Sequence, residues 1–440
     1  MKASAFVYPW DVDGDPAAPD LIAGLGVAQV TLAAAYHSTR ALTPRHPRHR
    51  VVTAEYAAAL YPPDGRWAGR ALRPYPAGRW APGDAWGRAA EALGAAGLEV
   101  HSWVVLAHSS RLGAEHPDTS VVNAYGDRYP WAPCIAQPAT RAYLTALAAE
   151  AAVRPGARGT ELESLGWYGL RHLHAHDKTA GVALGEAGQY LMSLCFCPDC
   201  RAGYGGRGLD PDALAAAVRT ALEPLWRGAP DDGGWAAVGR LLGEDTASAT
   251  RAWREETART LQEAAVAAVR AAAPEGFQVL LHADPVPYHC GADAGVDPAH
   301  ILSVADGVVV PCAGGTSLLA PFAAQARAGA VAAGRAEREG RSGRKGLPES
   351  EGRSGWESRP ESEGLPEGER LSEGERRPVR AAPVLAANFP VVAGLGGSPG
   401  TLAADAARAR AEGATELRLY HAGLASDADL SAVRDALSAH

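Results

Sequence analysis

Short runs of apolar, often β-branched residues alternate with alanine-rich runs of helical character along the whole chain. The apolar runs predict eight strands, at 3–8, 27–35, 98–106, 160–165, 277–282, 307–311, 383–388 and 416–421. The runs between them predict helices at 19–25, 85–96, 139–153, 252–273, 298–304, 317–333, 402–412 and 427–438. Such alternation is typical of parallel strands joined by crossover helices. Eight units predict an α/β fold, a (β/α)8 TIM barrel, as a single domain over residues 1–440.

Two segments interrupt this repeat. A long loop follows the fourth strand and carries an extra predicted helix at 211–226; loops in this position lie at the catalytic face of a barrel. Residues 334–378, between the sixth helix and the seventh strand, are rich in Arg, Glu, Gly, Ser and Pro, so we expect a disordered insertion there. A doubly wound open sheet is the alternative fold, but no phosphate-binding glycine motif follows a predicted strand.

Three cysteines fall within six residues, as Cys195, Cys197 and Cys200 in a C-x-C-x-x-C pattern. Thiolates this close in sequence cannot all pair with one another as disulfides, but they can converge on one soft cation. A closed structural zinc site takes four ligands in a tetrahedral arrangement, and Cys134 is the nearest other cysteine. We therefore predict a structural zinc ion on these four residues. Three reduced thiols in a small turn at Pro198 are the alternative.

Composition narrows the class of protein. The formal net charge of −8 gives no sign of the basic surface that nucleic-acid-binding proteins carry, which argues against a nucleic-acid partner. No apolar run approaches the ~20 residues that a membrane span requires, and the first residues lack the apolar region and cleavage site of a secretory signal. Four of the six cysteines gather at one predicted metal site rather than in a spread disulfide framework. We expect a cytoplasmic protein without a membrane partner, and the oligomeric state stays open.

Aromatic and imidazole side chains collect where the predicted strands end. If the barrel prediction holds, these ends meet at one mouth, and aromatic faces there can stack on the CH side of a sugar ring. Polar loops after strands are the simpler explanation, but scattered histidines would not single out one end of a barrel. The residues that we predict to bind substrate are Trp10, Tyr36, His37, His108, Trp167, His172, His174, His282, Asn388 and Tyr420.

Glu163 lies at the end of the fourth strand and is the candidate catalytic residue. Glu161 and Glu163 point to the same face of a strand, because side chains alternate with a period of two. A carboxyl at the strand tip, walled by Trp167 and Tyr168, would lose water and have a raised pKa. That is the environment of a general acid that is still protonated near neutral pH. A structural salt bridge to an arginine such as Arg171 is the alternative.

A run of alternating histidines follows this strand, at His172, His174 and His176, with Asp177 next to it. The spacing allows three imidazoles on one side of an extended segment, which is compatible with a second metal site. Substrate contacts or a solvated loop explain the same pattern without a metal.

The order of these features resembles the zinc-bearing β-galactosidases of glycoside hydrolase family 42, a branch of the (β/α)8 clan of retaining glycosidases. The resemblance is carried by Cys134, Glu163 and the Cys195–Cys200 motif and covers roughly residues 120–205. It implies that Glu163 is the general acid/base and that the four cysteines hold zinc beside it.

The chain also departs from that family. Leu162 stands where the family has an asparagine before its acid/base glutamate, and the stretch from Glu163 to Cys195 is longer. The clan's nucleophile is a glutamate at the end of strand seven, yet residues 383–390 contain no carboxylate. Asp284, at the end of strand five, is the best remaining partner for a mechanism that uses two carboxylates.

Three hypotheses follow. The first is a glycosidase-like hydrolase that acts on a small-molecule or oligosaccharide substrate, with Glu163 as general acid and Asp284 as second carboxylate. The second is a metal-dependent hydrolase or isomerase that uses His172, His174 and His176. The third is a catalytically silent barrel that binds sugar.

Overall fold

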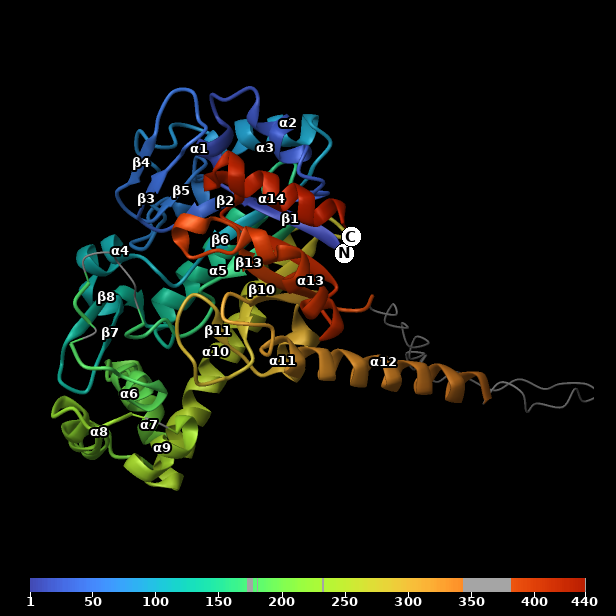
Figure 1. The fold of residues 1–440 in the computed structure, drawn as a ribbon. Coiled ribbons are helices and arrows are strands. Elements are labelled where there is room, and N and C mark those ends of the chain that lie inside the picture. Colours follow the sequence, from blue (N-terminus) through green and yellow to red (C-terminus); the bar gives the residue numbers. More distant parts are fainter. Residues whose placement is uncertain (172–176, 180, 232, 343–380, 440) are drawn as a thin grey trace, which may run out of the picture. The chain divides into compact units, whose positions relative to one another are not determined.

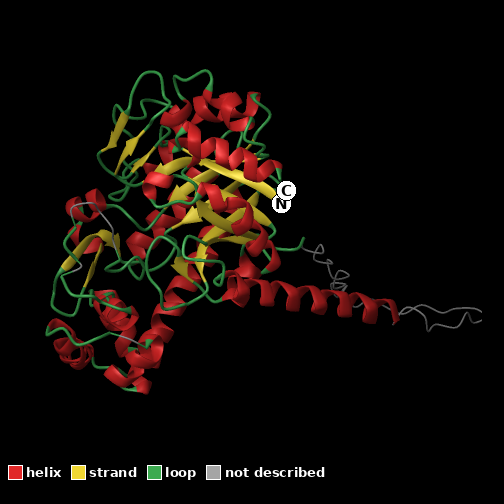
Figure 2. Ribbon diagram, viewed as in Figure 1, coloured by secondary structure: helices red, strands yellow, loops and turns green. Residues whose placement is uncertain are grey.

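The computed structural model describes residues 1–171, 177–179, 181–231, 233–342 and 381–439. Its centre is a barrel of eight parallel strands (Figures 1 and 2). The strands are β1 (Lys2–Val7), β2 (Gln29–Tyr36), β6 (Glu99–Val105), β9 (Gly159–Glu163), β10 (Gln278–Asp284), β12 (Gly307–Pro311), β13 (Val384–Pro390) and β14 (Glu416–Tyr420). The sheet closes because β1 pairs with both β2 and β14. The predicted (β/α)8 barrel and its eight strands are confirmed.

The helices between these strands also follow the predicted pattern. They are α2 (Ala18–Ala23), α3 (Ala85–Ala95), α5 (Pro138–Ala152), α10 (Glu244–Ala272), α11 (Pro298–Val304), α12 (Leu319–Ser342), α13 (Leu402–Ala411) and α14 (Asp427–Ser438). The largest differences are at α12, which ends at Ser342 rather than at 333, and at α10, which begins at Glu244 rather than at 252. Gly243, with φ of +81°, turns the chain into this helix, and acidic residues at 244 and 245 favour its N-terminus.

Most additions to the barrel follow the carboxyl ends of its strands. They are α1 (Pro9–Val12), the hairpin β3 (Thr39–Leu42) and β4 (Val51–Ala54), β5 (Ala58–Ala59), α4 (Ser110–Glu115), β7 (Ser120–Val122), β8 (Arg128–Pro133) and β11 (Ala294–Gly295). The long loop after β9 holds α6 (Glu186–Met192), α7 (Pro198–Gly205), α8 (Pro211–Trp226) and α9 (Gly234–Leu242), which lie together beside α10 (Figure 1). The predicted extra helix at 211–226 is α8.

The chain divides into two compact units, one of residues 1–323 with 383–440 and one of residues 324–382. The first unit contains all eight strands of the barrel. The expected insertion at 334–378 overlaps the end of α12, which continues to Ser342, and the rest of it lies outside the described residues. No helix in the described part of the chain is long and apolar enough to span a membrane.

The barrel interior is polar just below its carboxyl end. Glu161 accepts a hydrogen bond from the guanidinium of Arg418 (Nε to Oε1, 2.6 Å) and one from Thr31 (3.2 Å). Thr31 in turn shares a hydrogen bond of 2.9 Å with Ser4. All four side chains are buried. A buried charge is tolerated only when it is paired and hydrogen-bonded. The contacts of Glu161 with Arg418 and Thr31 therefore hold these side chains in place beneath the layer that contains Glu163.

Candidate active site and cysteine cluster

Glu163 is the last residue of β9, and 3% of its surface is exposed. The Trp103 indole donates a hydrogen bond to its Oε2 (2.7 Å), and the Tyr420 hydroxyl lies 3.5 Å from the same oxygen. Burial raises the pKa of Glu163 to about 7, although His282, Trp103 and Tyr420 act to lower it. In the described part of the chain the partners of Glu163 are thus an indole, a phenol and an imidazole, with no ion pair to Arg171.

His282, from β10, connects three carboxyl groups. Its Nδ1 lies 3.8 Å from Glu163 Oε2 and 3.6 Å from Asp293 Oδ1, and its Nε2 lies 3.6 Å from Glu161 Oε2. Burial acts to lower the pKa of His282, but the contacts with Asp293 and Glu161 and the charge of Glu163 outweigh it and bring the pKa to about 10. The ring is therefore an imidazolium in the middle of an acidic cluster.

Asp293 is a site residue that the sequence did not reveal. It precedes β11 in the loop after β10, and its side chain is 31% exposed. Its charge contributes to the raised pKa values of Glu163, Tyr168 and Tyr420. Asp293 is one of several aspartates in and beside that loop. No periodicity in the sequence indicates which of them lies at the barrel mouth.

Among the residues that the structure describes, two other than glycine have left-handed backbone, and both directly follow a barrel strand at this end. Ser164 (φ of 57°) comes after Glu163, and His421 (φ of 62°) comes after Tyr420. Such a conformation costs on the order of 1–3 kcal/mol and persists where the surroundings impose it. At Ser164 the amide donates to Ala292 O (2.8 Å). Strain of this kind clusters at functional sites.

Aromatic rings surround the acidic cluster. The Tyr8 hydroxyl bonds to Tyr36 and to His421, each at 2.9 Å, and Tyr8 stacks on Trp10 with centroids 4.6 Å apart. Among the predicted substrate residues, His37 stacks on Tyr36 and lies edge-on to His108. Trp10, Tyr36 and His108 are buried, whereas His37, Tyr168, Tyr420 and His421 keep part of their surface exposed.

Other predicted residues lie elsewhere or are fully engaged. The Trp167 indole donates to Arg254 O in α10 (2.9 Å), and the Arg254 guanidinium covers its ring. Asp284 accepts hydrogen bonds from the Val286 amide (2.8 Å) and from His289 (2.9 Å). Asn388, in β13, is buried, and its Oδ1 has no partner among the described residues. The predicted His172 and His174, and His176 of the alternative metal site, lie outside the described residues.

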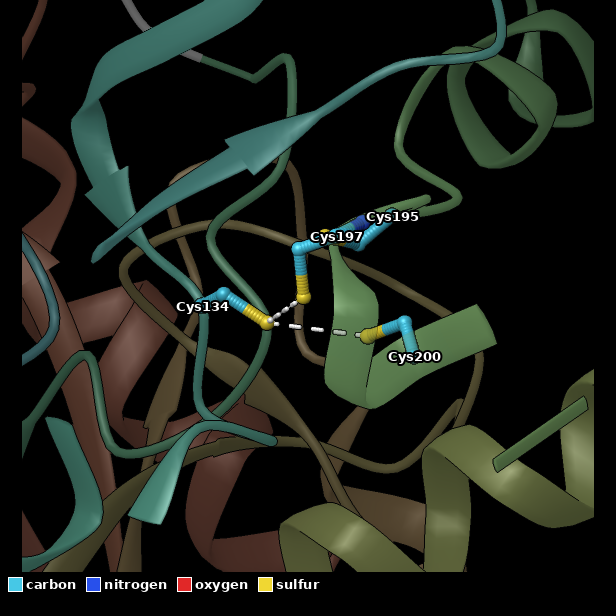
Figure 3. Close-up of side chains that lie close together, drawn as sticks. All are labelled: Cys134, Cys195, Cys197 and Cys200. Carbon is cyan, nitrogen blue, oxygen red and sulfur yellow. Dashed lines mark hydrogen bonds between the residues drawn. The ribbon is translucent and has the colours of Figure 1, made fainter. Parts of the chain in front are cut away.

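The four cysteines of the predicted metal site come together (Figure 3). Cys134 follows β8, and Cys195, Cys197 and Cys200 lie in the connection from α6 into α7. Their sulfur atoms all lie within 4.8 Å of one another, and Cys134 Sγ is 3.6 Å from Cys197 Sγ and from Cys200 Sγ. A tetrahedron of sulfurs about 2.3 Å from a central zinc has edges of about 3.8 Å.

The surroundings of the cluster also fit a metal. All four residues are buried and none is in a disulfide. The amides of Val122 and Cys197 donate to Cys195 Sγ at 3.5 and 3.4 Å. Hydrogen bonds from the other three thiols lower the pKa of Cys197, which favours its thiolate. Four thiolates would fill a tetrahedral ion, which leaves no position for substrate.

Comparisons with known proteins show the fold. No protein-family model and no curated protein matches the chain. Among solved structures, α-L-fucosidase isoenzyme 2 from Paenibacillus thiaminolyticus has a TM-score of 0.52 at 12% identity, covering 100% of this chain and 49% of that one, so the chain spans about half its length. The catalytic domain of β-amylase from Paenibacillus polymyxa has a TM-score of 0.51 at 13% identity, covering 100% and 98%.

A β-galactosidase from Bacillus circulans sp. alkalophilus also matches, with a TM-score of 0.36 at 13% identity over 71% of this chain and 40% of that one; that score is too low to support an argument. The protein is therefore a (β/α)8 barrel whose fold is similar to those of the fucosidase and the β-amylase domain. At these identities the likeness concerns the fold alone.

Proposed function

We propose that the protein is a glycosidase-like hydrolase that acts on a carbohydrate, with Glu163 as its general acid/base. The observation that carries the proposal is a buried carboxyl with a pKa of about 7 at the mouth of the barrel. A general acid works best when its pKa lies near the working pH, because it must hold a proton and still release it. The fold shared with fucosidase and β-amylase domains supports this choice of substrate class.

The two carboxyl oxygens of Glu163 have different contacts and therefore different roles in this proposal. The Trp103 indole and the Tyr420 hydroxyl both contact Oε2, and the contact of His282 is with the same oxygen. Oε1 has no such partner among the described residues, so it is the oxygen that faces substrate. Protonated Glu163 gives its proton to the glycosidic oxygen as the bond from the anomeric carbon to that oxygen breaks.

The partly exposed rings form the sugar-binding surface in this proposal. His37, Tyr168, Tyr420 and His421 offer ring surface at the mouth, where the buried Tyr36 packs against His37 and the buried His108 packs against Tyr168. The Tyr168 ring, for example, stacks on His108 with an interplanar angle of 5°. Aromatic bodies with polar tips bind the apolar face and the hydroxyls of a sugar together.

We further propose that Cys134, Cys195, Cys197 and Cys200 hold Zn²⁺. Their sulfur donors suit zinc, and the ion would tie the end of β8 to the start of α7. Its contribution is to folding: it holds together the loops that follow strands β6 and β9, and the proton transfer at Glu163 takes place without it.

The test is turnover of a panel of 4-nitrophenyl glycosides, including the β-galactoside and the α-L-fucoside, by the full chain and by Glu163→Gln. We expect release of nitrophenol by the wild type. Because nitrophenolate leaves without a proton donor, the loss of 10²–10⁴-fold in kcat expected of Glu163→Gln is measured on the corresponding methyl glycoside or disaccharide, whose leaving oxygen must be protonated. Glu91→Gln, on the exposed face of α3, is the matched control and keeps full activity. Sugar binding without any turnover in wild type or Glu163→Gln would instead identify a silent sugar-binding barrel.

A further inference from the structure

Asp293 and Glu163 both lie near the same nitrogen atom of His282. His282 Nδ1 lies 3.6 Å from Asp293 Oδ1 and 3.8 Å from Glu163 Oε2. The distance between these two carboxylate oxygens is therefore smaller than the sum of their distances to His282 Nδ1. Paired carboxyls are about 5–5.5 Å apart in retaining glycosidases and about 6.5–9.5 Å apart in inverting ones, which place a water molecule between one carboxylate and the sugar. The pair formed by Glu163 and Asp293 is compatible with either range.

The backbone fixes Asp293 against the strands that carry its partners. Ala292 O, one residue before it, accepts from the amide of Ser164, which follows Glu163. Ala294, one residue after it, pairs with Ala283 of β10, the neighbour of His282. A Cβ at Gly166 would lie 2.6 Å from the Ala294 side chain, so only glycine permits this approach. Backbone contacts on both sides of Asp293 therefore fix its position in the chain relative to β9 and β10.

The two carboxyls have different environments. Glu163 is almost fully shielded from water, whereas nearly a third of the Asp293 side chain is exposed. Two carboxyls with unequal access to water are the usual basis for dividing acid and base roles. Asp284 has other partners, because its oxygen atoms accept hydrogen bonds from the Val286 amide and from His289, and among the described residues it has no hydrogen bond or ion pair with Glu163 or His282.

We propose that Asp293 is the second carboxylate of the site and acts as the base that activates water, an inference that rests on the proposed glycosidase function. The water oxygen bonds to the anomeric carbon as the glycosidic bond breaks. Asp293 takes one proton of that water, and Glu163 gives its proton to the departing oxygen. One glycoside and one water become two free hydroxyl compounds, with inversion at the anomeric carbon. The His282 imidazolium lies between the two carboxyls and balances their charge as the protons move.

The first experiment follows turnover of the best 4-nitrophenyl glycoside from the panel. Asp293→Asn is expected to lower kcat by 10²–10⁴-fold while KM changes little, and Asp118→Asn, whose side chain is 99% exposed, is the control. In Asp293→Ala, added azide replaces water and restores product as a glycosyl azide. Proton NMR of the wild-type reaction is expected to show the inverted anomer first. Retention, or loss of turnover in Asp284→Asn but not in Asp293→Asn, would overturn the proposal.

The second measurement does not depend on activity. NMR titration of the His282 imidazole, assigned with His282→Asn, is expected to show a lower pKa in Asp293→Asn because one of its acidic partners is gone. An unchanged pKa would contradict the contact on which the inference rests. If no probe is turned over by the wild type, the proposed function fails. If Glu163→Gln abolishes turnover and Asp293→Asn does not, only the role of Asp293 fails.

Discussion

Replacing Arg418 by methionine is expected to remove a large part of the stability of the barrel. Arg418 and Glu161 are both 0% exposed, and they meet at 2.6 Å in the barrel interior. Arg418 also reaches Glu416 at 2.8 Å, but Glu161 has no other arginine or lysine partner among the described residues. Methionine fills most of the volume and removes the closest counter-ion of the buried Glu161 carboxylate, which keeps only the His282 imidazolium at 3.6 Å.

The size of the effect follows from the burial. Removing one partner of a fully buried ion pair costs about 3–5 kcal/mol, because the remaining carboxylate has no water and has lost its closest counter-ion. Burial acts to raise the pKa of Glu161, but Arg418 and His282 outweigh it and bring the pKa to about 2. This depressed pKa stabilises the wild type above the ordinary value of about 4.3, and that contribution is lost as the pH falls through about 2.

In Arg418→Met, burial is opposed only by the imidazoles of His282 and His101, so the pKa of Glu161 is expected to rise above its wild-type value. The variant therefore takes up a proton there at a higher pH than the wild type, and protonation relieves the cost of the buried charge. The destabilisation relative to wild type is therefore largest near neutral pH and shrinks as the pH falls toward about 4.

Urea unfolding followed by fluorescence of the 11 tryptophans measures this difference at several pH values. Arg227→Met, at a side chain 78% exposed, is the control and is expected to change the unfolding free energy by less than about 1 kcal/mol. Adding Glu161→Gln to Arg418→Met is expected to recover much of the loss. The reasoning is refuted if Arg418→Met costs no more than the control, or costs the same at pH 4 as at pH 7.

Four further predictions concern the site. Trp103→Phe removes a hydrogen bond to Glu163 and is expected to raise the pKa of that carboxyl, so the fall in kcat/KM at alkaline pH moves upward by about one unit. Glu163→Gln is expected to unfold at higher urea than wild type at pH 8, because a raised pKa makes the ionised carboxyl unfavourable once the pH exceeds about 7. Cys197→Ser is expected to lose one equivalent of zinc by elemental analysis and 2 kcal/mol or more, roughly, of unfolding free energy. Gly166→Ala is expected to displace Ala294 and lower kcat, while circular dichroism keeps its native shape.

Local patterns in the sequence were enough for the fold and for the cysteine cluster. Strand and helix periodicities are properties of neighbouring residues, and closure of the barrel follows from their alternation. Cys134 could be paired with the C-x-C-x-x-C motif because the chain has few cysteines and zinc needs four ligands. Short elements such as β3, β4, β7 and β8 escaped prediction because they lack a long apolar run.

The surroundings of Glu163 were harder to predict, and Ser164 explains why. The alternation of side chains that places Glu161 and Glu163 inside the barrel ends where the backbone turns left-handed at Ser164. Trp167 was expected to wall Glu163, but beyond this turn the chain leads its indole to α10 instead. Tyr420 was expected at this mouth because it ends a barrel strand, but Trp103 and Asp293 reach Glu163 from two further segments, and no spacing in the sequence indicates that.

The strained Ser164 also has a consequence for the exchange of amide hydrogens. Its N–H is protected by Ala292 O, so it can exchange with solvent only when the segment around Asp293 detaches. Detachment would let the backbone at Ser164 relax, which returns on the order of 1–3 kcal/mol and makes this opening cheaper than unfolding of the barrel. The Ser164 amide is therefore a natural reporter of how often that segment opens. A ligand that closes the site slows exchange at this one position well before it changes global stability.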